Sequence, residues 1–244
     1  MLTAAAAHCG VIDRVLPLYA HRLGRAYGPD NSAIALAGAL AAGVEGLEAD
    51  LCLSADGELV LLHDPWLALT TQLEGFAHER TGRELRAGGL LGLDDLLAVA
   101  PRAVALQLEV KAHADPALAL RTVDALADRV RGERRRRVEA LSFTAAVCGR
   151  AAGLGLPTRL VIWADYAPAA LARWARRAGV GGVCVEHFLL SAPLVATLRR
   201  GGLSVTTGTI NHPALLDRVL AFGPDAVTTD APHALREAVT AQAA

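Results

Sequence analysis

Short apolar stretches alternate with longer amphipathic stretches along almost the whole chain. The short ones are nearly continuous in valine, leucine, isoleucine and alanine, which is typical of parallel strands buried on both faces. They predict strands at Leu18–His21, Gly46–Leu53, Val104–Lys111, Val138–Phe143, Thr158–Trp163, Gly182–Glu186, Leu203–Thr207 and Ala226–Thr229.

The stretches between these strands repeat their apolar positions with helical spacing, and several begin with proline. Asp115 is a good N-cap residue before Pro116, and Gly43 is a good C-cap residue, so local chemistry supports the same boundaries. The pattern predicts helices at Ser32–Ala42, Leu93–Ala100, Pro116–Arg131, Thr144–Ala152, Pro168–Ala178, Ala192–Arg200, Pro213–Phe222 and Pro232–Ala241.

Eight strands that alternate with helices predict an α/β fold, a (β/α)8 TIM barrel with a small insertion after the second strand. The segment Glu58–His63 predicts an extra strand, and the glycine-containing segment 65–92 predicts an insertion over one rim of the barrel. We expect residues 1–244 to form a single domain. An open doubly wound sheet is the alternative, but the GxGxxG and Walker A patterns are absent.

Composition narrows the class of protein. Of 244 residues, 53% are hydrophobic, and 24 basic residues balance 25 acidic ones, which excludes disorder and argues against nucleic-acid binding. No apolar run reaches the roughly 18 residues that span a bilayer, and the first residues lack the basic segment of a signal peptide. We therefore expect a cytoplasmic protein without a transmembrane segment. The cysteines are scattered and should be reduced: Cys9, Cys52, Cys148 and Cys184.

Acidic side chains gather at the ends of successive predicted strands. Glu48 and Asp50 are two residues apart on one strand, so they point to the same side. Glu109 ends the next long strand. Side chains inside a barrel are mostly apolar, so three carboxylates there would repel one another unless they bound a cation. Ligation by oxygen alone favours Mg²⁺ or Ca²⁺ over zinc.

Bases and cations occupy the same strand ends. His21 and His63 suit proton transfer near neutral pH. Arg22 and Lys111 supply positive charge for a small anionic substrate such as a phosphate. Lys111 is also the only lysine beside 23 arginines, which suggests that an ammonium group is needed at this position.

The ordered set of short motifs resembles the glycerophosphodiester phosphodiesterase family. The motifs run through nearly the whole chain, and they include the rare residues Lys111, Asn31 and Asn211. They are His21-Arg22, Pro29-Asp30-Asn31-Ser32, Glu48-Ala49-Asp50, Ser54-Ala55-Asp56-Gly57, His63-Asp64-Pro65, Thr70-Thr71, Glu109-Val110-Lys111, Ser142-Phe143, Thr209-Ile210-Asn211 and Thr229-Asp230-Ala231-Pro232.

This resemblance implies a TIM-barrel hydrolase that releases glycerol 3-phosphate and an alcohol from glycerophosphodiesters. It implies a divalent cation held by Glu48, Asp50 and Glu109, with His21 and His63 as the general acid/base pair. It further implies that Arg22 binds the phosphate and that Lys111 lies near the phosphate or the cation.

The chain departs from the family pattern at three positions. Leu23 replaces the glycine of the HRG motif, and Asp30 replaces the glutamate of the PEN motif. Gly208 replaces a tryptophan that commonly packs over the substrate side of the barrel, so we expect its loss to leave space there.

Later strand ends carry secondary candidates. Glu186-His187 could contact substrate or form a satisfied polar pair. Trp163 and Phe188 could form an apolar wall, although core packing is the stronger expectation, and Asp230 could simply cap the final helix.

Three alternative functions remain open at this stage. One is a related barrel that cleaves a lipid headgroup and resembles sphingomyelinase D. Another is a barrel that binds a phosphate ligand without catalysis. In the third, Lys111 forms a Schiff base, but the neighbouring Glu109 should keep its amine protonated.

Overall fold

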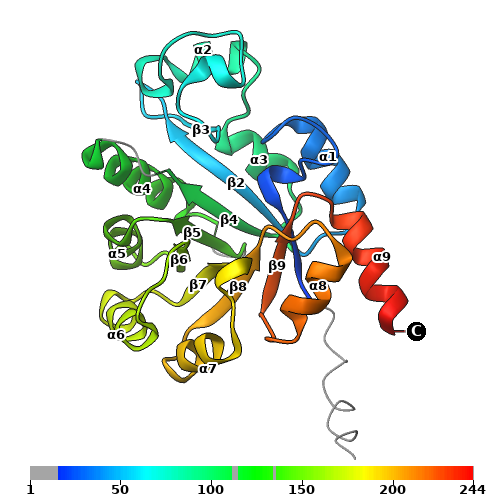
Figure 1. Ribbon diagram of the computed structural model, residues 1–244. Helices are drawn as coiled ribbons and strands as arrows, with labels where there is room; N and C mark the ends of the chain where they lie inside the picture. The colour runs from blue at the N-terminus through cyan, green and yellow to red at the C-terminus, as the bar shows by residue number, and fades with distance from the viewer. Residues whose placement is uncertain (1–15, 112–114, 134–135, 244) are drawn as a thin grey trace, which may run out of the picture.

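Eight parallel strands close into a ring in the computed structural model, which describes residues 16–111, 115–133 and 136–243. Along the sheet each strand pairs with the next, and β1 pairs with both β2 and β9, which confirms the predicted TIM barrel (Figure 1). The ring consists of β1 (Leu18–Ala20), β2 (Gly46–Leu53), β4 (Ala105–Val110), β5 (Val138–Ser142), β6 (Thr158–Ile162), β7 (Gly182–Glu186), β8 (Ser204–Gly208) and β9 (Ala226–Thr229).

The helices lie around the outside of this ring (Figure 1). The expected cap at Asp115 is present, because its carboxylate accepts a hydrogen bond from the Ala117 amide at 2.8 Å. Ser32, predicted as the first residue of its helix, is instead the N-cap, and its Oγ accepts from the Ala35 amide at 3.2 Å. The helices are α1 (Ala33–Ala41), α3 (Leu93–Val99), α4 (Pro116–Val130), α5 (Ala145–Gly153), α6 (Pro168–Ala178), α7 (Ala192–Arg200), α8 (Pro213–Leu220) and α9 (Pro232–Ala243).

The barrel strands have an apolar outer face and a polar inner face. On β2, Leu47, Ala49 and Leu51 are buried in a cluster with residues of α1, α3 and α4. Because side chains alternate along a strand, Glu48 and Asp50 point to the inside of the barrel. The same alternation on the other strands gives the barrel an interior rich in polar groups.

A partly buried ion pair lies in the amino-terminal half of the interior. Arg159 of β6 lies 3.2 Å from Oε1 of Glu139 on β5. The other carboxylate oxygen of Glu139, Oε2, accepts a 2.9 Å hydrogen bond from Gln107 of β4. A Cβ atom at Gly182 would lie 2.5 Å from Arg159 NH1, so a larger residue there would have to displace the guanidinium. The expectation of a mostly apolar interior is therefore wrong in this layer, and the site must lie at the carboxyl ends of the strands.

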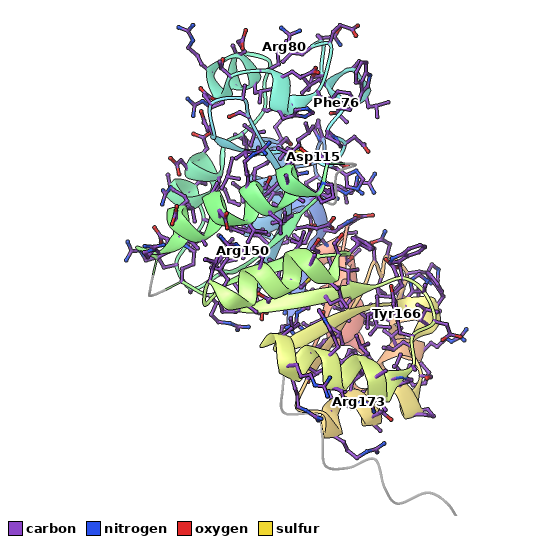
Figure 2. All side chains as sticks on the ribbon, turned by 90° about the vertical axis from the view of Figure 1, so that its left-hand side faces the viewer. Phe76, Arg80, Asp115, Arg150, Tyr166 and Arg173 are labelled. Atoms are coloured by element: carbon purple, nitrogen blue, oxygen red, sulfur yellow. The ribbon has the colours of Figure 1, made fainter. Side chains whose placement is uncertain are left out.

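The insertion after β2 is a small unit with its own core. Strand β3 (Leu59–Leu61) runs antiparallel to β2, and the segment then forms two 3-10 turns, Leu67–Leu69 and Ala77–Glu79, and helix α2 (Gly82–Ala87). Figure 2 labels Phe76 and Arg80 on this insertion, far from Arg173 on α6. Its apolar core consists of Cys52, Val60, Leu62, Leu67, Ala77 and Leu85.

Sequence patterning did not predict α2, although its signal is present. Thr81 Oγ1 accepts from the Glu84 amide at 3.3 Å, and the Thr81 amide donates to Glu84 Oε2 at 2.8 Å. This reciprocal arrangement is a capping box, and Thr-x-x-Glu is its sequence signature.

Free thiols are found at Cys52, Cys148 and Cys184. Cys52 and Cys148 are buried, as expected for small apolar residues, and burial raises the pKa of each thiol to about 12. Cys9 lies outside the described residues. Within the described ranges, none of the helices combines the length and the apolar character needed to cross a membrane.

Candidate active site

Three carboxylates converge at the carboxyl end of the barrel. Glu48 and Asp50 come from β2 and Glu109 from β4, where Asp50 and Glu109 are register partners. Each offers an oxygen atom, and these atoms all lie within 4.8 Å of one another. Glu48 is 4% exposed and Asp50 1% exposed. A buried set of hard oxygen donors at this spacing suits a divalent cation such as Mg²⁺ or Ca²⁺.

The raised pKa values of two of these carboxyl groups show that their negative charges are poorly stabilised by the protein alone. Desolvation, with the charge of Asp50 adding to it, raises the pKa of Glu48 to about 8. Burial also raises the pKa of Glu109. The residues present therefore fit a cation, because a bound cation would favour the ionised form of each carboxyl group.

Lys111 partly neutralises the cluster. Its Nζ atom lies 2.6 Å from Asp50 Oδ1 and 2.7 Å from Glu109 Oε1. Burial opposes the charged ammonium, but the charges of Glu109 and Asp50 prevail and raise the Lys111 pKa. Burial likewise opposes the charge of Asp50, and Lys111 reverses the effect and lowers the Asp50 pKa. An amine held protonated in this way is a poor Schiff-base nucleophile.

A left-handed turn follows β1 and aims its backbone at the cluster. The strand ends at Ala20, one residue earlier than predicted, because His21–Leu23 form a 3-10 turn. Arg22 has φ 48° and donates its amide to Glu48 Oε2 at 2.8 Å. Leu23 has φ 65° where the family has glycine. Its side chain is completely buried in the core, and this packing offsets the backbone strain.

The guanidinium group of Arg22 lies between two carboxylates, those of Asp30 and Asp50. Its NH1 atom donates to Asp30 Oδ2 at 2.6 Å. Asp30 therefore reaches the arginine even though it is one methylene shorter than the glutamate expected at this position. Arg22 Nε is buried, lies 3.7 Å from Asp50 Oδ2 and has no hydrogen-bond partner among the described residues. Arg22 thus adds a second positive charge, beside that of Lys111, next to the acidic cluster.

Asn31 fixes Asp50 from the next turn. Its side-chain nitrogen donates to Asp50 Oδ2 at 2.9 Å, and its oxygen accepts from the Asp50 amide at 3.3 Å. Asn31 is buried with φ 56°, a left-handed conformation that asparagine tolerates better than most residues. These two hydrogen bonds and the left-handed backbone explain why asparagine, a rare residue in this chain, occurs at position 31.

His21 is held by the far end of the chain. Its Nδ1 atom lies 2.7 Å from Asp230 Oδ1, and Asn211 donates to Asp230 Oδ2 at 2.7 Å. Burial lowers the pKa of His21, but the hydrogen bond to Asp230 and the charge of Glu48 outweigh it, and the net shift is upward. Asp230 thus binds His21 instead of serving as the expected helix cap.

His63 follows β3 and belongs to the same site. Burial is the main cause that lowers its pKa, and the positive charge of Lys111 adds to the shift. Its Nδ1 atom is buried without a hydrogen-bond partner in the described structure, although Asp64 Oδ1 lies 3.2 Å away. The two histidines therefore differ, because one has a firm carboxylate partner and the other does not.

Two expectations about the opposite wall need correction. A Cβ atom at Gly208 would lie 2.9 Å from Thr228 Cβ, so Thr228 already occupies the space expected next to this glycine. Trp163 and Phe188 were expected to pack in the core, but they are 57% and 66% exposed.

A closed barrel with carboxylates, histidines and an arginine at the carboxyl ends of its strands is typical of an enzyme active site. Comparisons with known proteins agree. The sequence profile of the Glycerophosphoryl diester phosphodiesterase family matches residues 21–234. The chain belongs to this family, which confirms the resemblance stated from its motifs.

Individual relatives support the same family. The Bacillus subtilis protein YhdW, provisionally named a glycerophosphodiester phosphodiesterase, is 23% identical over 88% of this chain and 94% of its own length. The structure of a protein from Silicibacter pomeroyi, provisionally named a glycerophosphoryl diester phosphodiesterase, is 26% identical with a TM-score of 0.81 and 95% coverage of both chains. A phosphodiesterase from Oleispira antarctica, in complex with the product sn-glycerol-3-phosphate, shares the fold at 22% identity, with a TM-score of 0.83 and coverage of 92% of this chain and 97% of its own.

Proposed function

We propose that this enzyme hydrolyses glycerophosphodiesters to glycerol 3-phosphate and an alcohol, with the help of a divalent cation. The observation that carries the proposal is the convergence of Glu48, Asp50 and Glu109, with oxygen atoms within 4.8 Å, beside a protonatable His21. The family and the glycerol 3-phosphate complex of the Oleispira antarctica enzyme supply the substrate class.

The three carboxylates would hold the cation, and Mg²⁺ and Ca²⁺ are the candidates because both prefer oxygen ligands. When bound, the cation withdraws negative charge from the phosphoryl oxygens and makes the phosphorus more electrophilic. Lys111 contacts two of the three carboxylates, so it partly neutralises their negative charge. It also contributes positive charge beside the phosphate.

The side chains of the protein divide the remaining work. Arg22, fixed by Asp30, contributes positive charge that attracts the phosphate. His21 and His63 form the acid/base pair. One removes a proton from the attacking water as the new P–O bond forms, and the other protonates the alcohol oxygen as the old P–O bond breaks.

We propose further that residues 1–244 act as one catalytic domain and that the inserted segment, about 65–92, borders the mouth of the barrel. The free thiols of Cys52, Cys148 and Cys184 suit a reducing compartment, which is consistent with a cytoplasmic location.

A metal-by-substrate screen tests the proposal. Purified enzyme, stripped with chelator and reloaded with Mg²⁺, Ca²⁺ or Mn²⁺, is incubated with glycerophosphodiesters, and the products are identified by phosphorus NMR. We expect glycerol 3-phosphate in the presence of a cation and none with chelator. A cyclic phosphate would favour the barrel that resembles sphingomyelinase D, and binding without turnover would favour a non-catalytic barrel.

Histidine variants test the acid/base pair. H21A and H63A should each lower kcat by about 10²- to 10⁴-fold, the usual contribution of a general acid or base. His233 is an exposed histidine on α9, and its ring pairs with Glu237, so H233A is the matched control and should keep the wild-type rate. Wild-type rates in H21A and H63A would refute the assignment.

A further inference from the structure

The carboxylate of Glu186 lies at the mouth of the barrel on the side opposite the acidic cluster. On β7, Val183 and Val185 are completely buried in the outer apolar cluster with residues of α6 and α7. Glu186 is one residue further along and therefore points to the inner side, where the strand ends. In the strand order of the ring, β7 is four strands from β2, which places Glu186 across the mouth from Glu48 and Asp50.

The neighbours of Glu186 on both sides follow from the strand register. On one side, Ile162 of β6 pairs with Val185, so Trp163 leaves its strand next to Glu186. On the other side, Glu186 pairs with Gly208, which has no side chain. By strand register, the half-buried Glu186 is therefore flanked by Trp163, which is 57% exposed, and by Gly208.

Glu186 has no direct partner in the part of the chain that the structure describes. The side chain makes no cap hydrogen bond, and it forms no ion pair there within 4.0 Å. His187 and His21 act on it electrostatically from longer range, while burial raises its pKa. Other carboxylates of the mouth have partners: Asp30 pairs with Arg22, Asp50 with Lys111 and Asp230 with His21.

We propose that Glu186 and Trp163 form a subsite for a positively charged group on the alcohol side of the substrate. A carboxylate beside an exposed tryptophan is the arrangement that attracts an ammonium or quaternary ammonium group, by charge and by cation–π interaction. The preferred substrates are then phosphodiesters of amino alcohols or quaternary ammonium alcohols. This inference rests on the proposed phosphodiesterase function and adds a preference among its substrates.

The two ends of such a substrate match the two sides of the mouth. Arg22 and Lys111 lie on the side of β1 and β4, where they attract the phosphate. Glu186 lies on the side of β7, where no cationic side chain of the described residues pairs with it, and there it attracts the ammonium group. A zwitterionic phosphodiester would therefore be oriented across the mouth by opposite charges at its two ends.

Substrate competition tests the subsite. The ratio of kcat/KM for glycerophosphocholine to kcat/KM for the uncharged-headgroup substrate glycerophosphoglycerol is measured for the wild type, E186Q and W163L. We expect the ratio to fall about tenfold in E186Q and severalfold in W163L, in line with the strength of charge and cation–π contacts. Glu237 is an exposed glutamate on α9, and E237Q, the matched control, should leave the ratio unchanged. An unchanged ratio in E186Q, or an equal loss for both substrates, would overturn the proposal.

A binding measurement separates this proposal from the proposed function. Choline chloride is titrated into the wild type, E186Q and W163L by calorimetry, with tetramethylammonium as a second probe. Binding that E186Q weakens about tenfold supports the subsite even if no phosphodiester is hydrolysed. Hydrolysis of phosphodiesters with no choline binding would uphold the function and refute the subsite.

Discussion

The Nδ1 atom of His21 lies 2.7 Å from Oδ1 of Asp230, a residue 209 positions later in the chain. The contact joins the turn after the first strand to the end of the last strand, at the seam where the barrel closes. Asn211, just after β8, fixes Asp230 through two hydrogen bonds. Its side-chain oxygen accepts from the Asp230 amide at 2.8 Å, and its side-chain nitrogen donates to the Asp230 carboxylate at 2.7 Å. Closure of the barrel thereby orients a histidine of the site.

Asp230 is therefore expected to act as a positioning residue. In D230N the hydrogen-bonded negative charge is lost, so the pKa of His21 should fall and the limb of the pH–rate profile that reports His21 should move to lower pH. We expect kcat to fall about 10- to 100-fold, which is less than in H21A. Asp128 on α4 is exposed and pairs with Arg131, so D128N is the control. An unshifted profile in D230N would contradict the positioning role.

Glu48 should make the metal-free enzyme less stable as the pH rises. Its pKa, raised by burial and by Asp50 from 4.5 to about 8, means that the folded state keeps a proton that the unfolded chain releases. Between these values the unfolded state binds fewer protons, so higher pH favours unfolding, by up to about 1.4 kcal/mol per pH unit.

Urea unfolding in chelator at pH 5 to 8 measures this dependence. E48Q cannot titrate at this position and should show a flatter dependence than the wild type. Because cation binding requires the ionised carboxylate, we also expect wild-type Mg²⁺ affinity to rise over the same pH interval and to be weaker in E48Q, as measured by calorimetry. Equal pH slopes in the two proteins would contradict the assignment to Glu48.

Lys111 should be essential to stability as well as to activity. K111M leaves Asp50 and Glu109 without the ammonium that lies within 2.7 Å of both, and breaking such a buried pair costs about 3–5 kcal/mol. Denaturant unfolding measures the loss, and added Mg²⁺ should recover part of it. Because Lys111 is the only lysine, borohydride treatment with a carbonyl compound tests the Schiff-base alternative directly. We expect no lysine adduct in the wild type.

The partly buried pair of Glu139 and Arg159 should contribute to stability above the acid range. Burial raises the pKa of Glu139, but Arg159 and Gln107 outweigh it and lower the pKa below 4.5. The contribution is therefore present at neutral pH and is lost as the pH falls through the folded-state value. E139Q should be about 1–3 kcal/mol less stable at pH 7 and less sensitive to acid. Thermal melts at pH 7 and pH 3.5 compare the two proteins, and equal acid sensitivity would disprove the prediction.

Local sequence patterns predicted the barrel and the acidic cluster for a simple reason. Side chains alternate along a strand, and parallel strands end at one edge, so Glu48, Asp50 and Glu109 had to meet wherever β2 and β4 are neighbours. Motif resemblance added the histidines and Arg22. The same local patterns predicted neither the polar layer around Arg159 nor the exposure of Trp163, because inward and outward faces acquire their surroundings only when the ring closes.

The amino-acid sequence by itself determined the order of strands and helices and the residue types at the strand ends, since both follow from hydrophobic spacing and capping over a few neighbouring residues. Only the tertiary structure decided which distant groups pair. It joined His21 to Asp230, placed Arg22 Nε 3.7 Å from Asp50, and made Trp163 the neighbour of Glu186 in the strand register. These relationships depend on the register of strands around a closed barrel, and no short stretch of sequence encodes that register.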